Sequence, residues 1–390
     1  MTASALSCRL ALLWCLALLL PACIDRYEPE AISSPRNFLV VDGFINNQGI
    51  SSVKLSRTFP LSTKTTTRPP VERGATVFIE SETGTRYRLL ESVPGTYTSP
   101  SLVLTSGAKY RLHVTTAGAS SSGSSAYRTE TYASDYVAAK TTPPIESLLW
   151  RAEATGVGIY LNTRDPANAT QYYRWEFEET WEIIPPHRPL IEYFNGRIQP
   201  IRVRYPTLCW GSEQSTAIQI SKTTALSQDV VANFPLRQLP ISSPRLHERY
   251  SILVQQHALS KAEYEYWEML RKNTESIGSL FDPQPTQLTG NMHCLSTPGE
   301  VVLGFVGVHS VESKRLFIAR PELPRDWRRG TGYEACVPPD TVIAQYTPAE
   351  QAFGSGNQVP INEIPGGWTA SSIDCVDCRT RGTVVRPSFW

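Results

Sequence analysis

Two groups of side chains in this sequence have residue types that could do chemistry. Glu178, Glu179 and Glu182 offer carboxylates, and glycoside cleavage uses two of these at about 5 Å or about 6.5–9.5 Å apart. His293 stands beside Cys294, as a base beside a thiol nucleophile. Adjacent residues on a strand point to opposite faces, however, and charged residues along a strand are typical of a solvated face. We therefore predict that neither group is catalytic and that the protein is not an enzyme.

The cysteines form a third feature, because Cys375 and Cys378 spell a C-x-x-C motif. A zinc site would need a second pair or histidines at matching spacing, and the sequence has neither, so we predict no metal and no cofactor. Structural disulfides are the better interpretation in an exported chain. The candidates are Cys209, Cys294, Cys336, Cys375 and Cys378, an odd number that leaves one thiol free.

The pairing follows in part from loop length. A direct bond between Cys375 and Cys378 would close a tiny, strained ring, so we favour longer connections. A bond from one of them to Cys336 closes a loop of about 40 residues, and the other would join Cys209 or Cys294.

The start of the chain resembles a lipoprotein leader. An apolar run from Leu10 to Leu20 is too short to span a bilayer as a helix, and Ala22 before Cys23 suits a signal peptidase. The segment resembles a lipobox, with Pro21 at a position where a smaller residue is usual. We expect cleavage of residues 1–22 and acylation of Cys23 as a membrane anchor. An ordinary secretory signal with an incidental Cys23 is the alternative.

Composition bounds the rest of the molecule. The 390 residues exceed one typical domain, and 41% hydrophobic with 19% charged residues describes a folded chain. A net charge of +1 gives no reason to expect a nucleic-acid partner. We predict a mainly β chain with two sandwich units and one helix in the second. The predicted parts are a tether over 23–37, an N-terminal β-sandwich over 38–142, and a second β-sandwich over 143–390.

The two units differ in pattern. Short strands at sandwich spacing make the first unit similar to the carboxypeptidase-regulatory type. Residues 173–178 alternate between aromatic and charged side chains, which resembles a fibronectin type III or immunoglobulin-like sandwich. Residues 182–247 are rich in Pro and Arg and are interpreted as an insertion. A capping box formed by Ser260 and Glu263 predicts a helix over 260–277 with an apolar stripe in the core, followed by a disulfide-tied tail.

Surface features supply the remaining candidates. Trp210, Trp327 and Trp368 stand in loop-like sequence and could stack on sugar rings or enter a partner's pocket. Thr341 lies in an Asp-Thr-Val run that resembles the O-glycosylation sites of some bacterial envelope proteins. Acidic residues soon after Cys23 favour the cell surface over the periplasmic face of the membrane.

Several short motifs in a fixed order carry a family resemblance. They are Leu39-Val40-Val41-Asp42-Gly43, residues 278–285, Gly290-Asn291, Lys314 to Ile318, Cys375 to Arg379 and Pro387 to Trp390. With the lipobox Cys23, they make the chain similar to the domain of unknown function 4249 family. The resemblance implies an outer-membrane lipoprotein of the kind often encoded beside TonB-dependent transporters, which are outer-membrane β-barrel proteins. It implies no catalytic residues.

These observations lead to one expectation and its rivals. We expect a non-enzymatic, lipid-anchored accessory subunit of an outer-membrane complex with a TonB-dependent transporter. Surface capture of a glycan or peptide substrate is one alternative, and a subunit of an outer-membrane biogenesis machine is another. A hydrolase is the least supported rival, since it depends only on the carboxylates around Glu178.

Overall fold

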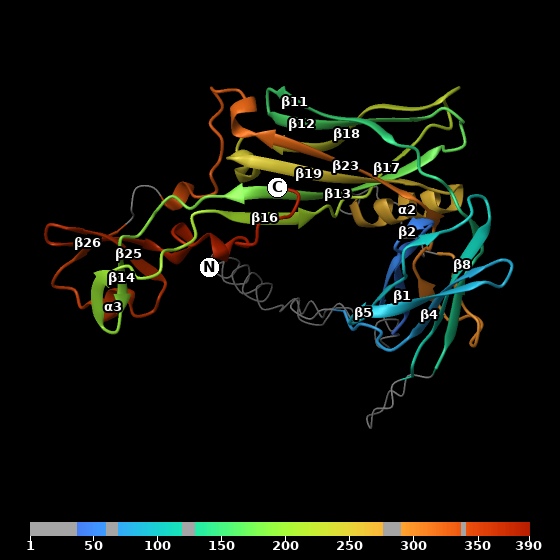
Figure 1. Ribbon diagram of the computed structural model, residues 1–390, viewed down its shortest axis with the longest axis horizontal. Coiled ribbons are helices and arrows are strands. Elements are labelled where there is room, and N and C mark those ends of the chain that lie inside the picture. The colour runs from blue at the N-terminus through green and yellow to red at the C-terminus, as the bar shows by residue number, and fades with distance from the viewer. Residues whose placement is uncertain (1–36, 60–68, 119–128, 276–289, 337–340) are drawn as a thin grey trace, which may run out of the picture.

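The computed structural model describes residues 37–59, 69–118, 129–275, 290–336 and 341–390, and at Thr341 it describes the backbone alone. The described chain forms three lobes along the long axis of the molecule, with the first sandwich at one end (Figure 1). The prediction of a mainly β chain with a sandwich-like arrangement is confirmed. No helix among the described residues is long and apolar enough to cross a bilayer.

The N-terminal sandwich is built from one sheet of eleven strands. Its strands are β1 (Leu39–Asn46), β3 (Ser52–Arg57), β4 (Thr76–Ser81), β5 (Arg86–Val93), β6 (Thr96–Thr98), β8 (Lys109–Thr115), β9 (Thr131–Ser134), β10 (Val137–Ala138), β20 (Met292–Cys294), β21 (Val302–Leu303) and β22 (Val308–His309), beside a separate pair β2 (Gln48–Gly49) and β7 (Leu102–Val103). Strand β5 pairs with β4 through its first half and with β6 through its second, so it passes between the two layers.

Residues 292–309 correct the predicted domain boundary. The sequence placed them in the second unit, whereas β21 and β22 run parallel to β1 and β20 pairs with β9. Val302, Val306 and Val308 are buried in the core of the first sandwich. Strands of two or three residues show no measurable periodicity, and their partners lie far away in the sequence, so local pattern could not assign them.

The second sandwich packs a three-stranded sheet on a five-stranded one (Figure 1). Its strands are β11 (Ile145–Glu153), β12 (Gly156–Asp165) and β18 (Asp229–Pro240) in one sheet, and β13 (Tyr172–Ile183), β16 (Cys209–Gln214), β17 (Gln219–Lys222), β19 (Arg249–Ala258) and β23 (Val311–Ala319) in the other. Tyr173, Trp175 and Phe177 of β13 face the core between the sheets. The indole nitrogen of Trp175 donates to Gln256 Oε1 at 2.8 Å, so the largest core side chain has its polar atom satisfied.

The predicted insertion over 182–247 is wrong for most of its length. Strands β16 and β17 pair with β13, and β18 pairs with β12, so they are integral parts of the second sandwich. Only the first part leaves the body, as the hairpin of β14 (Ile191–Phe194) and β15 (Arg197–Pro200). Pro and Arg residues weaken the alternation in this stretch, which hid the strands from sequence analysis.

The tail forms a third lobe with its own sheet, which the two-unit prediction missed. The order is β24 (Thr341–Ala344), β26 (Gly367–Ser372) and β25 (Gln358–Ile364), beside α3 (Ala349–Phe353) and the β14–β15 hairpin (Figure 1). Short 3-10 turns lie at Pro244–Leu246, Arg320–Glu322, Glu334–Cys336, Ile373–Cys375 and Cys378–Thr380. Disulfides join Cys336 to Cys375 and Cys209 to Cys378, which are the long connections that the sequence favours.

Helix α2 (Lys261–Glu275) lies between the two sandwiches (Figure 1). Ser260 Oγ accepts from the Glu263 amide at 3.1 Å and caps the helix, so this helix is confirmed as far as residue 275. Residues 276 and 277 lie outside the described residues. The second half of the predicted capping box is wrong, because the Glu263 carboxylate turns toward His309 instead.

Candidate ligand-binding cleft

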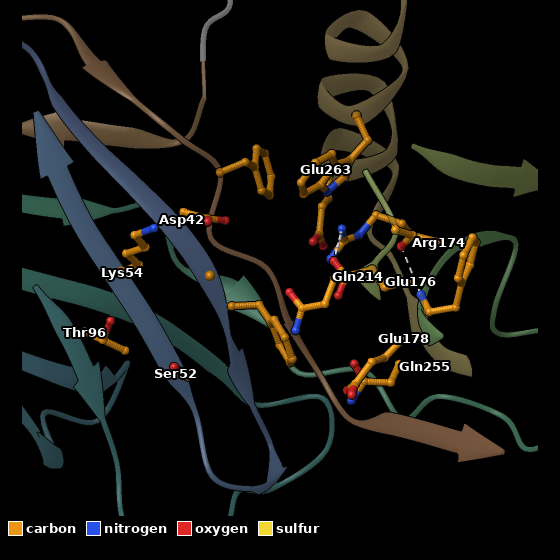
Figure 2. Close-up of a pocket in the computed structure, with 16 residues that line it drawn as sticks. Asp42, Ser52, Lys54, Thr96, Arg174, Glu176, Glu178, Gln214, Gln255 and Glu263 are labelled. Carbon is orange, nitrogen blue, oxygen red and sulfur yellow. Dashed lines mark hydrogen bonds and ion pairs between the residues drawn. The ribbon is translucent and has the colours of Figure 1, made fainter. Parts of the chain in front are cut away.

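A cleft of about 730 Å³ lies between the two sandwiches. One wall comes from β1 and β3, the other from β13, β16, β19 and α2 (Figure 2). Its lining residues are Asp42, Gly43, Phe44, Ser52, Lys54, Thr96, Arg174, Glu176, Phe177, Glu178, Gln214, Ser215, Gln255, Glu263, Trp267 and Phe305. A volume of this size suits a small ligand or a short stretch of a larger one.

The floor of the cleft is the outward face of β13. Because side chains alternate along a strand, burial of Tyr173 and Trp175 places Arg174, Glu176 and Glu178 on the opposite face. Pairing with β19 sets Gln255 directly opposite Glu176. The charged residues that alternate with aromatic ones along β13 therefore form the polar floor of the site.

Arg174 is held by two contacts that fix its guanidinium. It forms an ion pair with Glu176 Oε1, and its Cζ lies 4.1 Å from the centre of the Trp267 ring. A guanidinium over an indole face is favourable because the ring carries negative charge density there. The contact also ties α2 to β13 within the same wall of the cleft.

Glu263 reaches the cleft from the first turn of α2 (Figure 2). It is only 3% exposed, and its Oε1 lies 3.4 Å from Nε2 of the buried His309. Its Oε2 has no hydrogen-bond partner among the described residues. A methyl group added at Gly307 would stand 2.2 Å from that oxygen, so glycine is what allows the carboxylate to pack here.

Behind Glu263 lies an aromatic and histidine cluster at the boundary between the sandwiches. Phe44 stacks on His309 at 4.5 Å and meets the edge of His257 at 5.1 Å. Burial lowers the pKa of His257 well below its ordinary value, and the neighbouring His309 and Arg174 add to this effect. The imidazole ring of His257 is consequently uncharged at neutral pH.

An apolar arm of about 360 Å³ continues the cleft. It shares Asp42, Lys54 and Trp267 with the larger cavity and adds Tyr266 and Leu270 from α2. Burial raises the pKa of the Tyr266 hydroxyl, and the Asp42 carboxylate contributes in the same direction. The site thus joins a charged chamber to an aromatic and aliphatic one.

The carboxylates suggested by the sequence do not come together. Glu178 lines the cleft, whereas Glu179 is buried on the opposite face, where it accepts from Arg237 Nε at 3.1 Å and from the Tyr250 hydroxyl at 2.7 Å. Glu182 accepts from the indole nitrogen of Trp390 at 2.8 Å. The three carboxylates therefore lie in three separate parts of the structure and do not form one site.

His293 and Cys294 also separate. The His293 ring is more than half exposed and pairs with Asp135 at 3.0 Å, while Cys294 is buried as a free thiol. Sγ of Cys294 lies with oxygens of Glu130 and Glu300 in a group whose members are all within 4.8 Å, a spacing that could hold a cation. Hydroxyl groups of neighbouring residues already donate to both carboxylates.

The three tryptophans proposed for contact lie in different places. Trp210 is 9% exposed and buried in β16, which corrects its assignment to a surface loop. Trp327 packs at the edge of the second core, and Trp368 lies in the third lobe near Phe353. They do not form one platform.

Two modification candidates remain predictions. Cys23 lies outside the described residues, as does most of the tether over 23–37. Thr341 begins β24, and its side chain is likewise outside the described part of the chain.

Sequence analysis missed the residues on the helix side of the cleft. The sequence pattern predicts that Glu263 caps the helix, and the apolar stripe that it predicts for the core includes Trp267. In the structure Trp267 is half-buried and lines both cavities. The spacing of the apolar residues correctly predicts which face of the helix turns toward the rest of the protein. It cannot distinguish a buried core from the wall of a cleft.

Comparison with known families gives one match. The family model described as a domain of unknown function (DUF4249) matches residues 24–315 of the chain. The matched range includes the first sandwich, the second sandwich as far as Arg315 in β23, and every residue that lines the cleft. No curated protein matches the chain.

Proposed function

The chain belongs to the DUF4249 family, and from this premise we propose that it is a non-enzymatic, lipid-anchored accessory protein of an outer-membrane complex. Its partner in this proposal is a β-barrel protein, a TonB-dependent transporter. The anchor is the acylated Cys23, and the protein faces the cell surface. Support for the anchor comes from the short apolar leader and the small residue before the cysteine.

The observation that carries the proposal is the cleft between the sandwiches. An accessory protein of a transporter needs a place to hold what it delivers, and clefts between domains are common ligand sites. The cleft combines fixed polar groups with an aromatic arm, which is the usual make-up of a binding site. The sequence left ligand capture as an alternative to the accessory role. We combine the two and propose that the accessory protein captures the ligand in this cleft.

The non-enzymatic part of the proposal is supported by how the acidic groups are used. Glu179 is paired with Arg237 and Arg245, and Glu182 holds the C-terminal Trp390. These contacts give each carboxylate a structural task. Glu178 alone of the three remains in the cleft.

Purification of the full acylated chain from membranes in mild detergent tests the proposal. A TonB-dependent transporter is the co-purifying protein expected from mass spectrometry. The matched control is the same preparation from cells that express Cys23→Ser, in which the partner should be strongly depleted. Co-purification of barrel-assembly components instead would replace the transporter role by the biogenesis role, and a chain recovered alone would contradict both.

A further inference from the structure

The carboxylates of the cleft outnumber its cations. Asp42, Glu176, Glu178 and Glu263 line it, against Lys54 and Arg174. Arg174 already neutralises Glu176. Among the lining residues the other three carboxylates are accompanied by one lysine, while Arg315 of β23 lies outside the lining but near enough to interact with Glu178. The lining of the cleft therefore attracts positive charge.

Among the residues that line the cleft, Glu263 has a buried carboxylate oxygen to which no described residue donates a hydrogen bond. Its side chain is nine-tenths or more buried, and Oε2 has no hydrogen-bond partner among the described residues. Figure 2 shows this carboxylate directed from α2 into the cleft. Lys140 lies close enough for its pKa to respond to Glu263, but its ammonium donates to the Leu259 carbonyl at 3.0 Å. A buried carboxylate oxygen without a donor is costly, so a donor supplied by a ligand would complete the site.

One cation, the guanidinium of Arg174, is already bound in the cleft by side chains of the protein. The Arg174 guanidinium lies over the Trp267 ring and pairs with a carboxylate at the same time. A second cation at Glu263 would find a comparable setting, with Trp267 and Phe305 lining the same cavity. Tyr266 and Leu270 then offer apolar surface in the adjoining arm.

We propose that the cleft binds a peptide segment with a lysine or arginine side chain beside an apolar side chain. The cation pairs with Glu263, and Asp42 and Glu178 line the same cleft. The apolar side chain enters the arm lined by Tyr266 and Leu270. This inference rests on the capture role proposed above and names its ligand class. A neutral glycan would leave the excess negative charge of the cleft without a counter-charge.

Calorimetry with the detergent-purified full chain and the tripeptide Lys-Trp-Lys tests the inference. We expect saturable binding that weakens as salt rises, because the partners carry opposite charges. Glu263→Gln should lower the affinity by about ten-fold or more, since it removes one charge from a buried pair. Glu265→Gln is the matched control, because this carboxylate lies on the solvent side of the same helix, and it should leave the affinity unchanged.

Two further probes separate this inference from the proposed function. Lys-Trp-Lys acetylated at both its side chains and its N-terminus, and the neutral glycan maltoheptaose, should bind at least ten-fold more weakly than the free peptide. Equal binding of the acetylated peptide, or a Glu263→Gln affinity equal to that of the unaltered chain, would overturn the inference. The co-purification with a transporter would stand in that case. Loss of the co-purification with retained peptide binding would overturn the accessory role and keep the ligand class.

Discussion

Among single residues, His257 has the most consequential protonation state. It is 1% exposed at the boundary between the sandwiches, between Phe44 and His309. Burial lowers its pKa well below the ordinary value, with His309 and Arg174 as further causes. The Glu176 carboxylate stands 3.9 Å from its Nε2, too far for a hydrogen bond. The folded protein therefore keeps this ring uncharged.

We predict that the free energy of unfolding falls as pH drops below about 6.5. In the unfolded chain His257 takes up a proton in that range, whereas in the folded protein it does not. The unfolded state then binds more protons, and stability is lost toward acid, by up to about 1.4 kcal/mol for each pH unit between the two pKa values. Denaturant titrations from pH 8 to pH 5 should give a shallower loss for His257→Gln than for the unaltered chain.

The controls for this titration come from the other histidines. Burial also lowers the pKa of His113 and of His247, so both contribute a common acid loss to every variant. His293→Gln is the matched control, because His293 is exposed on the first sandwich, and it should keep the full loss. Parallel curves for His257→Gln and the unaltered chain would show that the boundary between the sandwiches tolerates a charged ring.

At the scale of elements, the start of α2 is held by one capping bond. Ser260 Oγ accepts from the Glu263 amide, which otherwise has no partner within the helix. Ser260→Ala should lower the free energy of unfolding by about 1 kcal/mol. Thr274→Ala, an exposed change in the last turn of the same helix, should cost clearly less. Equal losses in denaturant titrations would mean that the cap does not define the helix start.

The disulfide between Cys336 and Cys375 should hold the third lobe on the body. It closes a loop with a sequence separation of 39, for which the chain-entropy model gives about 4 kcal/mol. We predict that Cys336→Ser combined with Cys375→Ser makes residues 341–376 the first site of limited proteolysis. Cys294→Ser is the control, because Cys294 is a free thiol in the first sandwich. Identical cleavage patterns for the double variant and the unaltered chain would show that this disulfide is not needed to hold the third lobe.

The elements also show why sequence reasoning reached only part of the fold. Strand β13 was predictable because its alternation extends over twelve residues with aromatic side chains on one face. The strands β20, β21 and β22 were not, since their pairing depends on β9 and β1, which lie far away in the chain. In the site, Glu178 was recognised as outward-facing. Glu263 and Trp267 were not assigned to a cleft, because the wall opposite them belongs to another sandwich.

For the whole molecule, the contacts between the two sandwiches determine how firmly the walls of the cleft are held. Helix α2 lies between the sandwiches, and the Lys140 ammonium binds the Leu259 carbonyl across the same boundary. The ring of His309 in β22 adds to this contact, because it packs against His257 of β19 and lies beside the Glu263 carboxylate of α2. Side-chain contacts thus hold the two walls of the cleft together. A ligand would meet a largely preformed site, which lowers the entropy cost of binding.

The last prediction concerns where this molecule resides. A diacylglycerol at Cys23 should hold it to the outer membrane, since two acyl chains bind far more firmly than one. Cys23→Ser should move the protein to the soluble fraction, and the acyl mass should be absent from its N-terminus. In intact cells, an externally added protease should cleave the acylated protein and leave a periplasmic marker whole. Membrane retention of Cys23→Ser would contradict the anchor, whereas protection from the protease would place the acylated protein on the periplasmic face, where its cleft could not meet a ligand from outside.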